Sequence, residues 1–222
     1  MANGVSKTRE PGTLTERGQR TRTALVAAAR VVFERDGFVN ARITDIAETA
    51  GVAHGSFYSY FTSKEEIFRA VIEQLQEELT QSRREQLADS APDTLWAVVL
   101  DANRRYLKTW QTYTDIMRLW EDVAILDEQV MGMFDATRMA FVRRAEAAMA
   151  RLQQDGGVDP KIDTRVAAYA LTAMVSRFAY VWFTRGDEHD FDQAADQLTR
   201  LWLNALGVPE ARWDQPLKGE AP

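Results

Sequence analysis

Hydroxyl, imidazole and small side chains gather between residues 54 and 60 in a form that could read nucleic acid. Such groups can hydrogen-bond to base edges and phosphate oxygens in a major groove, and a glycine permits close approach of the backbone. The same composition also fits an ordinary helical corner of an all-α protein, so this segment alone leaves two interpretations open. The residues concerned are His54, Gly55, Ser56, Tyr58 and Tyr60.

Two short helices separated by a tight turn would position these side chains. The apolar residues of the first helix recur at helical spacing, as Ile43, Ile46, Ala47 and Ala50. Gly51 follows, where a left-handed residue commonly ends a helix. Val52 and Phe57 can pack back on the first helix, which leaves the polar residues on the outer faces. The pattern therefore predicts a helix-turn-helix.

A third, longer helix is predicted from residue 63 to residue 86. Ser63 and Glu66 have the spacing of a capping box, in which both side chains satisfy free amide groups at a helix start. Lys64 lies in the first turn, where we expect a phosphate contact. Farther along, an apolar stripe predicts that the helix faces a core: Ile67, Val71, Leu75 and Leu79.

The stretch AGVAHGSFYSYFTSKEEIF resembles the DNA-binding domain of the TetR family of bacterial transcriptional regulators. The resemblance covers about the first third of the chain, from Arg20 to Leu79, and includes the Asp-Gly-Phe turn at residues 36–38. It implies an all-α homodimer with an N-terminal three-helix DNA-binding domain. It also implies a C-terminal helical domain for dimerisation and ligand binding, in which a small molecule releases palindromic operator DNA. A repressor is expected. Activation stays open, because whether a bound regulator represses or activates depends on where the operator lies relative to the promoter.

Two positions depart from the family pattern. Ala41 and Arg42 stand where Ser or Thr is usual before the second helix, so we expect Asn40 or Thr44 to cap that helix and Arg42 to hold a phosphate. Ala53 replaces the usual Ser or Thr at the start of the recognition helix, a lost cap that costs about 1 kcal/mol.

The chain divides into five predicted parts. Residues 1–19 form a flexible arm, 20–62 the helix-turn-helix domain, 63–86 the connecting helix, 87–210 the ligand-binding and dimerisation domain, and 211–222 a tail. The first helix is expected over residues 21–36. Helices of the C-terminal domain are expected over residues 94–112, 114–123, 127–154, 163–185 and 191–206.

Charge is divided unevenly between the two ends of the chain. The net charge is -6, but residues 1–64 carry nine Lys and Arg against six Asp and Glu. A basic head on an acidic body can bind phosphate locally, although so small an excess also fits chance. Arg17, Arg20 and Arg22 are expected to contact phosphates or enter a minor groove; a solvated basic run is the alternative.

Apolar stripes on the last two helices predict a four-helix dimer interface, with intramolecular core as the alternative. The predicted interface residues are Ala167, Leu171, Met174, Phe178, Leu198, Leu201, Trp202 and Ala205.

Aromatic and methionine side chains are frequent in the middle helices and could line a pocket for an apolar or aromatic effector, or simply form core. The predicted ligand contacts are Trp96, Asn103, Trp110, Met117, Trp120, Phe134, Met139, Phe178 and Trp182. An orienting polar contact is expected from one of several neighbours: Asn103, Arg105, Arg118, Glu121 or Arg138.

Enzyme chemistry is not expected from this composition. The chain has no cysteine and two histidines, His54 and His189, and it has no glycine-rich phosphate loop, so we predict no catalytic residue, cofactor or metal. Asp187 to Asp192 is better explained as a solvated turn in which Asp190 caps the last helix. No uninterrupted apolar run suggests a bilayer span, and a cytoplasmic protein is expected. The rival interpretation is a small-molecule binding or scaffold protein with this fold and no operator.

Overall fold

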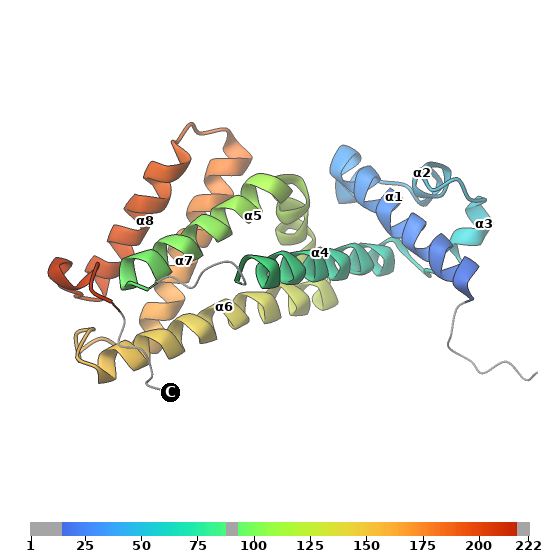
Figure 1. The fold of residues 1–222 in the computed structure, drawn as a ribbon. Helices are drawn as coiled ribbons and strands as arrows, with labels where there is room; N and C mark the ends of the chain where they lie inside the picture. The colour runs from blue at the N-terminus through green and yellow to red at the C-terminus, as the bar shows by residue number, and fades with distance from the viewer. Residues whose placement is uncertain (1–14, 88–92, 217–222) are drawn as a thin grey trace, which may run out of the picture. The chain divides into compact units, whose positions relative to one another are not determined.

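The computed structural model describes residues 15–87 and 93–216, with the side chains of 82–87 left aside. Within these residues the chain is helical and forms no strand, which confirms the predicted all-α class (Figure 1). It divides into two compact units, residues 1–74 and 75–222. The α-helices are α1 (Glu16–Asn40), α2 (Ile43–Thr49), α3 (His54–Phe57), α4 (Lys64–Leu87), α5 (Leu95–Ala124), α6 (Glu128–Gln154), α7 (Thr164–Arg185) and α8 (Phe191–Ala205).

Helix α1 starts earlier than expected. The Thr15 hydroxyl caps it by accepting a hydrogen bond from the Gly18 amide at 3.2 Å, so residues 16–19 are helical and do not belong to an arm. The rest of the expected arm lies outside the described residues. At the other end, Gly37 takes a φ of 74°, which interrupts the helix where the Asp-Gly-Phe turn was expected.

The first unit is built around an apolar face of α1. Leu25, Ala29 and Phe33 are fully buried there. Phe33 and Phe38 stack at 5.6 Å, and both meet the edge of Phe68 at 5.2 Å between ring centroids. These aromatic contacts join α1, its C-terminal turn and α4 within one core.

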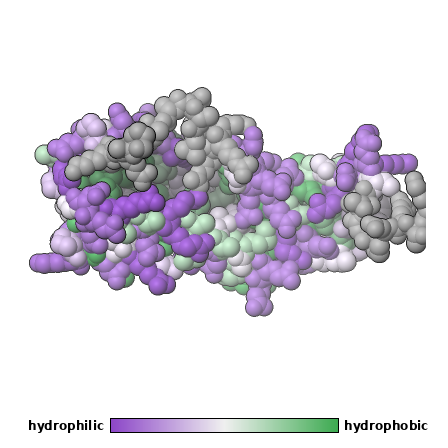
Figure 2. Space-filling view, turned by 60° about the horizontal axis from the view of Figure 1, so that its bottom comes forward, coloured by the Kyte–Doolittle hydropathy of each residue, from purple (hydrophilic) through white to green (hydrophobic). Residues whose placement is uncertain are grey.

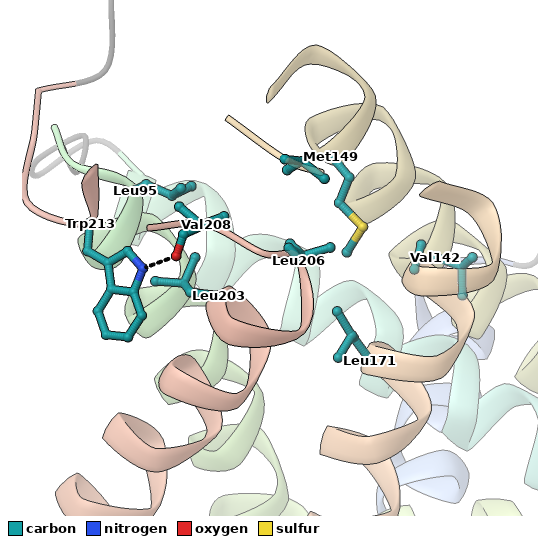
Figure 3. Packing of buried hydrophobic residues seen from close by; sticks show 10 residues of the cluster. Leu95, Val142, Met149, Leu171, Leu203, Leu206, Val208 and Trp213 are labelled. Atoms are coloured by element: carbon teal, nitrogen blue, oxygen red, sulfur yellow. Dashed lines mark hydrogen bonds between the residues drawn. The ribbon is translucent and has the colours of Figure 1, made fainter. Parts of the chain in front are cut away.

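The second unit packs α5 against α6, α7 and α8, with α6 also against α7 (Figure 1). The helix bounds agree closely with those expected. The break expected between residues 112 and 114 is a kink at Tyr113, so α5 continues as one helix across it. Figure 3 shows part of the core, in which Met149 of α6, Leu171 of α7 and Leu203 of α8 meet.

The chain after α8 does not begin as a free tail. Trp213 is buried, and its Nε1 donates to the Val208 carbonyl at 3.0 Å (Figure 3). Its ring stacks on Trp96 at 5.3 Å. Arg200 lies over both indole rings. The packed region therefore extends beyond the expected boundary at residue 210, because this tryptophan has a site on α5 to fill.

Helix α7 is long and apolar enough, by length and a mean hydropathy of 1.3, to cross a membrane. Arg177 interrupts the apolar run of this helix, which is why the sequence shows no uninterrupted apolar segment here. A core helix of a helical bundle has the same composition, and α7 contacts α5 and α6.

Hydrophilic side chains cover most of the face in Figure 2, with smaller apolar areas between them.

Candidate nucleic-acid interface

The turn between α2 and α3 has the geometry that the sequence predicts. Gly51 has a φ of 69° and its amide donates to the Glu48 carbonyl at 3.0 Å. The Val52 amide donates to the Ala47 carbonyl at 3.0 Å, which completes a Schellman ending. The chain therefore reverses direction at Gly51, a position that favours glycine, and α3 can start at His54.

Helix α3 separates a buried face from an exposed one. Phe57 is fully buried, whereas His54, Gly55 and Tyr58 are exposed and Ser56 and Tyr60 are half-buried. The His54 and Tyr58 rings meet edge to face, with centroids 5.5 Å apart. Phe57 thus anchors the helix while a polar and aromatic surface points outward, as the pattern predicted.

Gly55 is not required by the protein's own packing. A Cβ built on it would meet no atom within 4 Å, and its φ is not positive. Neither steric crowding nor backbone conformation requires a glycine here, and the close approach of DNA stays a prediction.

The start of α2 differs from the expectation. Arg42 is the N-cap and makes no side-chain capping bond. The Asn40 amide donates to the Asp36 carbonyl, and the Thr44 hydroxyl donates to the Asp45 carboxylate at 3.1 Å, so the prediction that one of them caps α2 is wrong. Arg42 and Thr44 are both exposed. Amide donors at the start of α2 consequently stay available to solvent or an anion.

The three N-terminal arginines lie on α1. Arg17 and Arg22 are exposed, and Arg20 pairs with Glu16. Arg22 also lies over the Phe61 ring at 5.1 Å. Because a helix is about 10–12 Å wide and the minor groove about 6 Å, these residues cannot enter that groove as an extended arm would. A phosphate contact stays as a prediction.

Lys64 at the start of α4 has protein partners. Its ammonium donates to the Val39 carbonyl at 3.1 Å and the Ala41 carbonyl at 3.2 Å, and it lies 4.7 Å from the centroid of the Phe38 ring. Sequence analysis did not anticipate these bonds. One of the three ammonium protons is left for the predicted phosphate contact.

The capping box beside Lys64 is present in altered form. The Ser63 hydroxyl accepts from the Glu66 amide at 3.2 Å, as predicted. The Glu66 carboxylate bonds to the amide and the hydroxyl of Thr62, each at 2.6 Å, instead of returning to Ser63. These bonds lower the pKa of Glu66, and the carboxylate holds the turn between α3 and α4.

Most of the predicted ligand contacts are core residues of the second unit. Trp110, Met117, Trp120 and Trp182 are buried. Asn103 is also buried, and its amide donates to the Thr199 hydroxyl at 3.1 Å. Side-chain volume and polarity cannot distinguish core from pocket wall, because both use the same residue types.

Three other predicted contacts are engaged with neighbours. Trp96 stacks on Trp213, the Met139 sulfur accepts from the Tyr169 hydroxyl, and Phe178 packs on Trp182. Phe134 does line a cavity of about 350 Å³ between α5, α6 and α7. Glu121 and Arg138, two of the expected polar contacts, line it as well.

Two of the predicted dimer contacts are buried within the unit. Leu171 is 7% exposed and Leu198 is 4% exposed, so both belong to the core of the protomer. Ala167, Met174, Phe178 and Trp202 are half-buried, and Leu201 and Ala205 are exposed. The exposed face of α7 is offset from the predicted stripe, with Val166, Ala170, Ala173 and Arg177 on it.

The acidic turn before α8 has the role expected of it. The Asp190 carboxylate accepts from the Gln193 amide at 2.8 Å and caps α8. Nowhere in the described part of the chain do three or more potential metal ligands lie together.

An all-α chain with a helix-turn-helix unit, an outward-facing α3 and a separate helical unit defines a DNA-binding regulator. Residues 25–71 match the family described as bacterial regulatory proteins, tetR family. The chain is 26% identical to the transcriptional regulator TtgR of Pseudomonas putida over 211 residues, 88% of this chain and 96% of that protein. It is also 26% identical to UidR of Escherichia coli K12 over 158 residues, 69% of this chain and 76% of that protein.

Among solved structures, the fold is similar to NalD of Pseudomonas aeruginosa, with a TM-score of 0.65 and 24% identity over 88% of this chain and 100% of that one. The chain resembles TetR-family bacterial regulators in its N-terminal part, residues 25–71, and the curated relatives that match over most of its length are transcriptional regulators. It is a DNA-binding transcriptional regulator and not an enzyme.

Proposed function

We propose that the chain is a repressor that binds a palindromic operator as a homodimer and is released by a small apolar or aromatic effector. The observation that carries the DNA-binding part is the outward face of α3, where His54 and Tyr58 are exposed above a fully buried Phe57. The relative NalD is described as the secondary repressor of a multidrug efflux pump, which supports the repressor assignment by similarity.

The proposed DNA contacts fall into two groups. Base edges would be met by His54, Ser56, Tyr58 and Tyr60, with Gly55 allowing close approach. Phosphates would be met by Arg17, Arg20, Arg22, Arg42, Thr44 and Lys64. A regulator that binds chromosomal DNA acts in the bacterial cytoplasm, which is therefore the compartment we propose.

A homodimer is proposed because two recognition helices must reach successive major grooves about 34–36 Å apart. Val166 is 64% exposed on α7 and Leu201 is 52% exposed on α8. The small residues Ala170, Ala173 and Ala205, exposed on the same two helices, would let a second protomer pack closely. This exposed face replaces the buried Leu171 and Leu198 in the proposed interface.

The proposed release acts through α4, which follows the helix-turn-helix directly in the chain. An effector that binds better to a conformation unable to bind DNA would shift the protein toward that conformation. To test release, candidate ligands are titrated into the protein–operator complex. A ligand that binds tightly and leaves operator affinity unchanged would contradict the coupling.

DNA binding is tested with the duplex upstream of the protein's own gene. We expect affinity that falls steeply with salt but survives competitor DNA. Tyr58→Ala should weaken operator binding by about tenfold to a hundredfold, since a lost base contact costs about 1–3 kcal/mol. Its melting temperature should stay unchanged because the side chain is 51% exposed. Binding without sequence preference would favour a scaffold or small-molecule binding protein instead.

A further inference from the structure

The cavity of the second unit lies between the end of α5, the first turns of α6 and the middle of α7. Its apolar wall comes from Ala124, Met131 and Phe134, with the Tyr180 ring beside them. Ile125, 79% exposed, lies at the rim. The volume of about 350 Å³ is enough for a molecule with one aromatic ring and a short substituent.

Five charged side chains also line this cavity, and most have partners. Arg138 donates to the Asp135 carboxylate at 3.1 Å and 3.3 Å. Asp122 has Arg118 at 3.8 Å. The Arg177 guanidinium lies over the Tyr180 ring, 4.7 Å from its centroid.

Glu121 is the carboxylate of this cavity without a direct partner among the described residues, and only the longer-range attraction of Arg177 favours its charge. Among the described residues its carboxylate takes part in no hydrogen bond and no ion pair within 4 Å. It is half-buried, and burial raises its pKa to about 7, helped by Asp122 and opposed by Arg177. Keeping a carboxylate ionised in such a place is costly until a positive charge comes close.

We propose that this cavity binds an amphipathic organic cation, with the Glu121 carboxylate beside the positive charge and the Phe134 and Tyr180 rings beside the apolar part. The role of this cation as the releasing effector rests on the function proposed above. The binding of this cation to the free protein does not depend on that function.

Charge complementarity favours a cation over an anion. The cavity presents three carboxylates and two guanidinium groups. An anion could reach Arg177, which lies over the Tyr180 ring, but it would have to compete with Asp135 for Arg138 and would approach the two carboxylates of Glu121 and Asp122. A cation needs no existing pair to break, and an aromatic ring near its charge adds a cation–π attraction.

The pH dependence has a definite sign. A bound cation favours the ionised form of Glu121. When Glu121 is protonated, its carboxyl group must therefore lose a proton for the cation to bind. Below pH 7 the free protein holds this proton, and affinity falls. Affinity for a permanently charged cation should therefore rise about tenfold between pH 6 and pH 8, since one proton is coupled to binding.

The probe is benzyltrimethylammonium, whose charge does not depend on pH, and phenylacetate serves as an anion of similar size. Binding to the full chain is measured by calorimetry without DNA at pH 6 and pH 8. We expect the ammonium to bind more tightly than phenylacetate and more tightly at pH 8. Glu121→Gln should weaken ammonium binding at least tenfold at pH 8 and abolish its pH dependence.

Glu128→Gln is the matched control, because it is the same substitution at an exposed residue. Glu128 lies at the start of α6 and does not line the cavity. It should bind the ammonium as the unchanged protein does. The melting temperature of Glu121→Gln should not fall, since the neutral form already suits this environment.

Three results would overturn the proposal: no ammonium binding at millimolar concentration, tighter binding of phenylacetate, or an unchanged affinity in Glu121→Gln. Because DNA is absent, none of them bears on operator binding. Conversely, a chain that binds the ammonium but no operator would overturn the proposed function and leave this site intact.

Discussion

The Lys64 ammonium lies where the C-terminal turn of α1, the start of α2 and the start of α4 meet. Its two carbonyl partners are Val39, in the last turn of α1, and Ala41, which links α1 to α2. A cation at the end of a helix also complements the partial negative charge of the terminal carbonyls. Lys64 therefore holds the helix-turn-helix to α4 within the first unit, in addition to any phosphate contact.

Lys64→Met separates these two roles, because methionine keeps an apolar stem beside Phe38 and removes the donors. Loss of the carbonyl bonds should destabilise the first unit by about 1–2 kcal/mol and weaken operator binding several-fold. If positioning dominates, the slope of log affinity against log salt stays unchanged. If a phosphate contact dominates, the slope falls by about 0.9 and the melting temperature barely changes.

Arg42→Met provides the comparison for this experiment. Arg42 is exposed and makes no capping bond, so its replacement should reduce the salt slope by about 0.9 with little effect on stability. Equal slopes in the wild type and in both variants would mean that neither side chain contacts a phosphate.

At the scale of the element, α3 is four residues long, and its N-cap, Ala53, has no side-chain hydrogen bond. Glycine inside so short a helix weakens it further, because glycine loses more backbone entropy on folding than alanine does. The recognition helix is therefore weak. Residues with a higher helix propensity at these positions would make it more stable. This choice makes sense when the outer surface of α3 must lie against another molecule.

Gly55→Ala is expected to raise stability and lower operator affinity at the same time. The protein has room for the methyl group, and alanine favours a helix by about 0.5–1 kcal/mol. In contact with DNA the same methyl group would keep the backbone away, so we expect operator affinity to fall at least tenfold in an anisotropy titration.

Gly132→Ala in α6 is the matched control, since a Cβ there also meets no atom within 4 Å. It should raise the melting temperature without any change in operator affinity. Unimpaired operator binding by Gly55→Ala would show that the backbone of α3 does not approach DNA closely.

At the scale of the whole molecule, the proposed function depends on two copies of this chain. The face of α7 and α8 that carries Val166 and Leu201 stays exposed in the described part of the second unit, and α7 is apolar enough to resemble a membrane span. Burying that face against a second copy would explain its composition.

Val166→Glu should therefore convert the dimer to a folded monomer, because two carboxylates would face each other near a two-fold axis. Sedimentation equilibrium should show the smaller mass, and operator affinity should fall at least a hundredfold since one half-site remains. Leu126→Glu is the control, at a residue 68% exposed in the turn between α5 and α6, and it should stay dimeric. Two variants of equal mass would contradict the proposed interface.

The sequence by itself determined which segments are helical and many of their ends, although the start of α1 and the cap of α2 differ from the prediction. Apolar spacing, Gly51 in its Schellman ending, the Ser63 cap and the break at Tyr113 all depend on residues within about five positions of one another. These local signals are readable from the sequence alone, which is why the helix-turn-helix could be predicted, although helices this short also need the core of the first unit to be stable.

Tertiary structure alone decided which apolar side chains became core, cavity wall or free surface. Leu171 and Leu198 were predicted at an interface and are buried, and eight of the nine predicted ligand contacts do not line the cavity. Lys64 finds partners 23 and 25 residues away, whereas Glu121 makes no hydrogen bond or ion pair with any residue that the structure describes. These outcomes depend on how helices distant in sequence rotate against each other, and periodicity carries no information about that rotation.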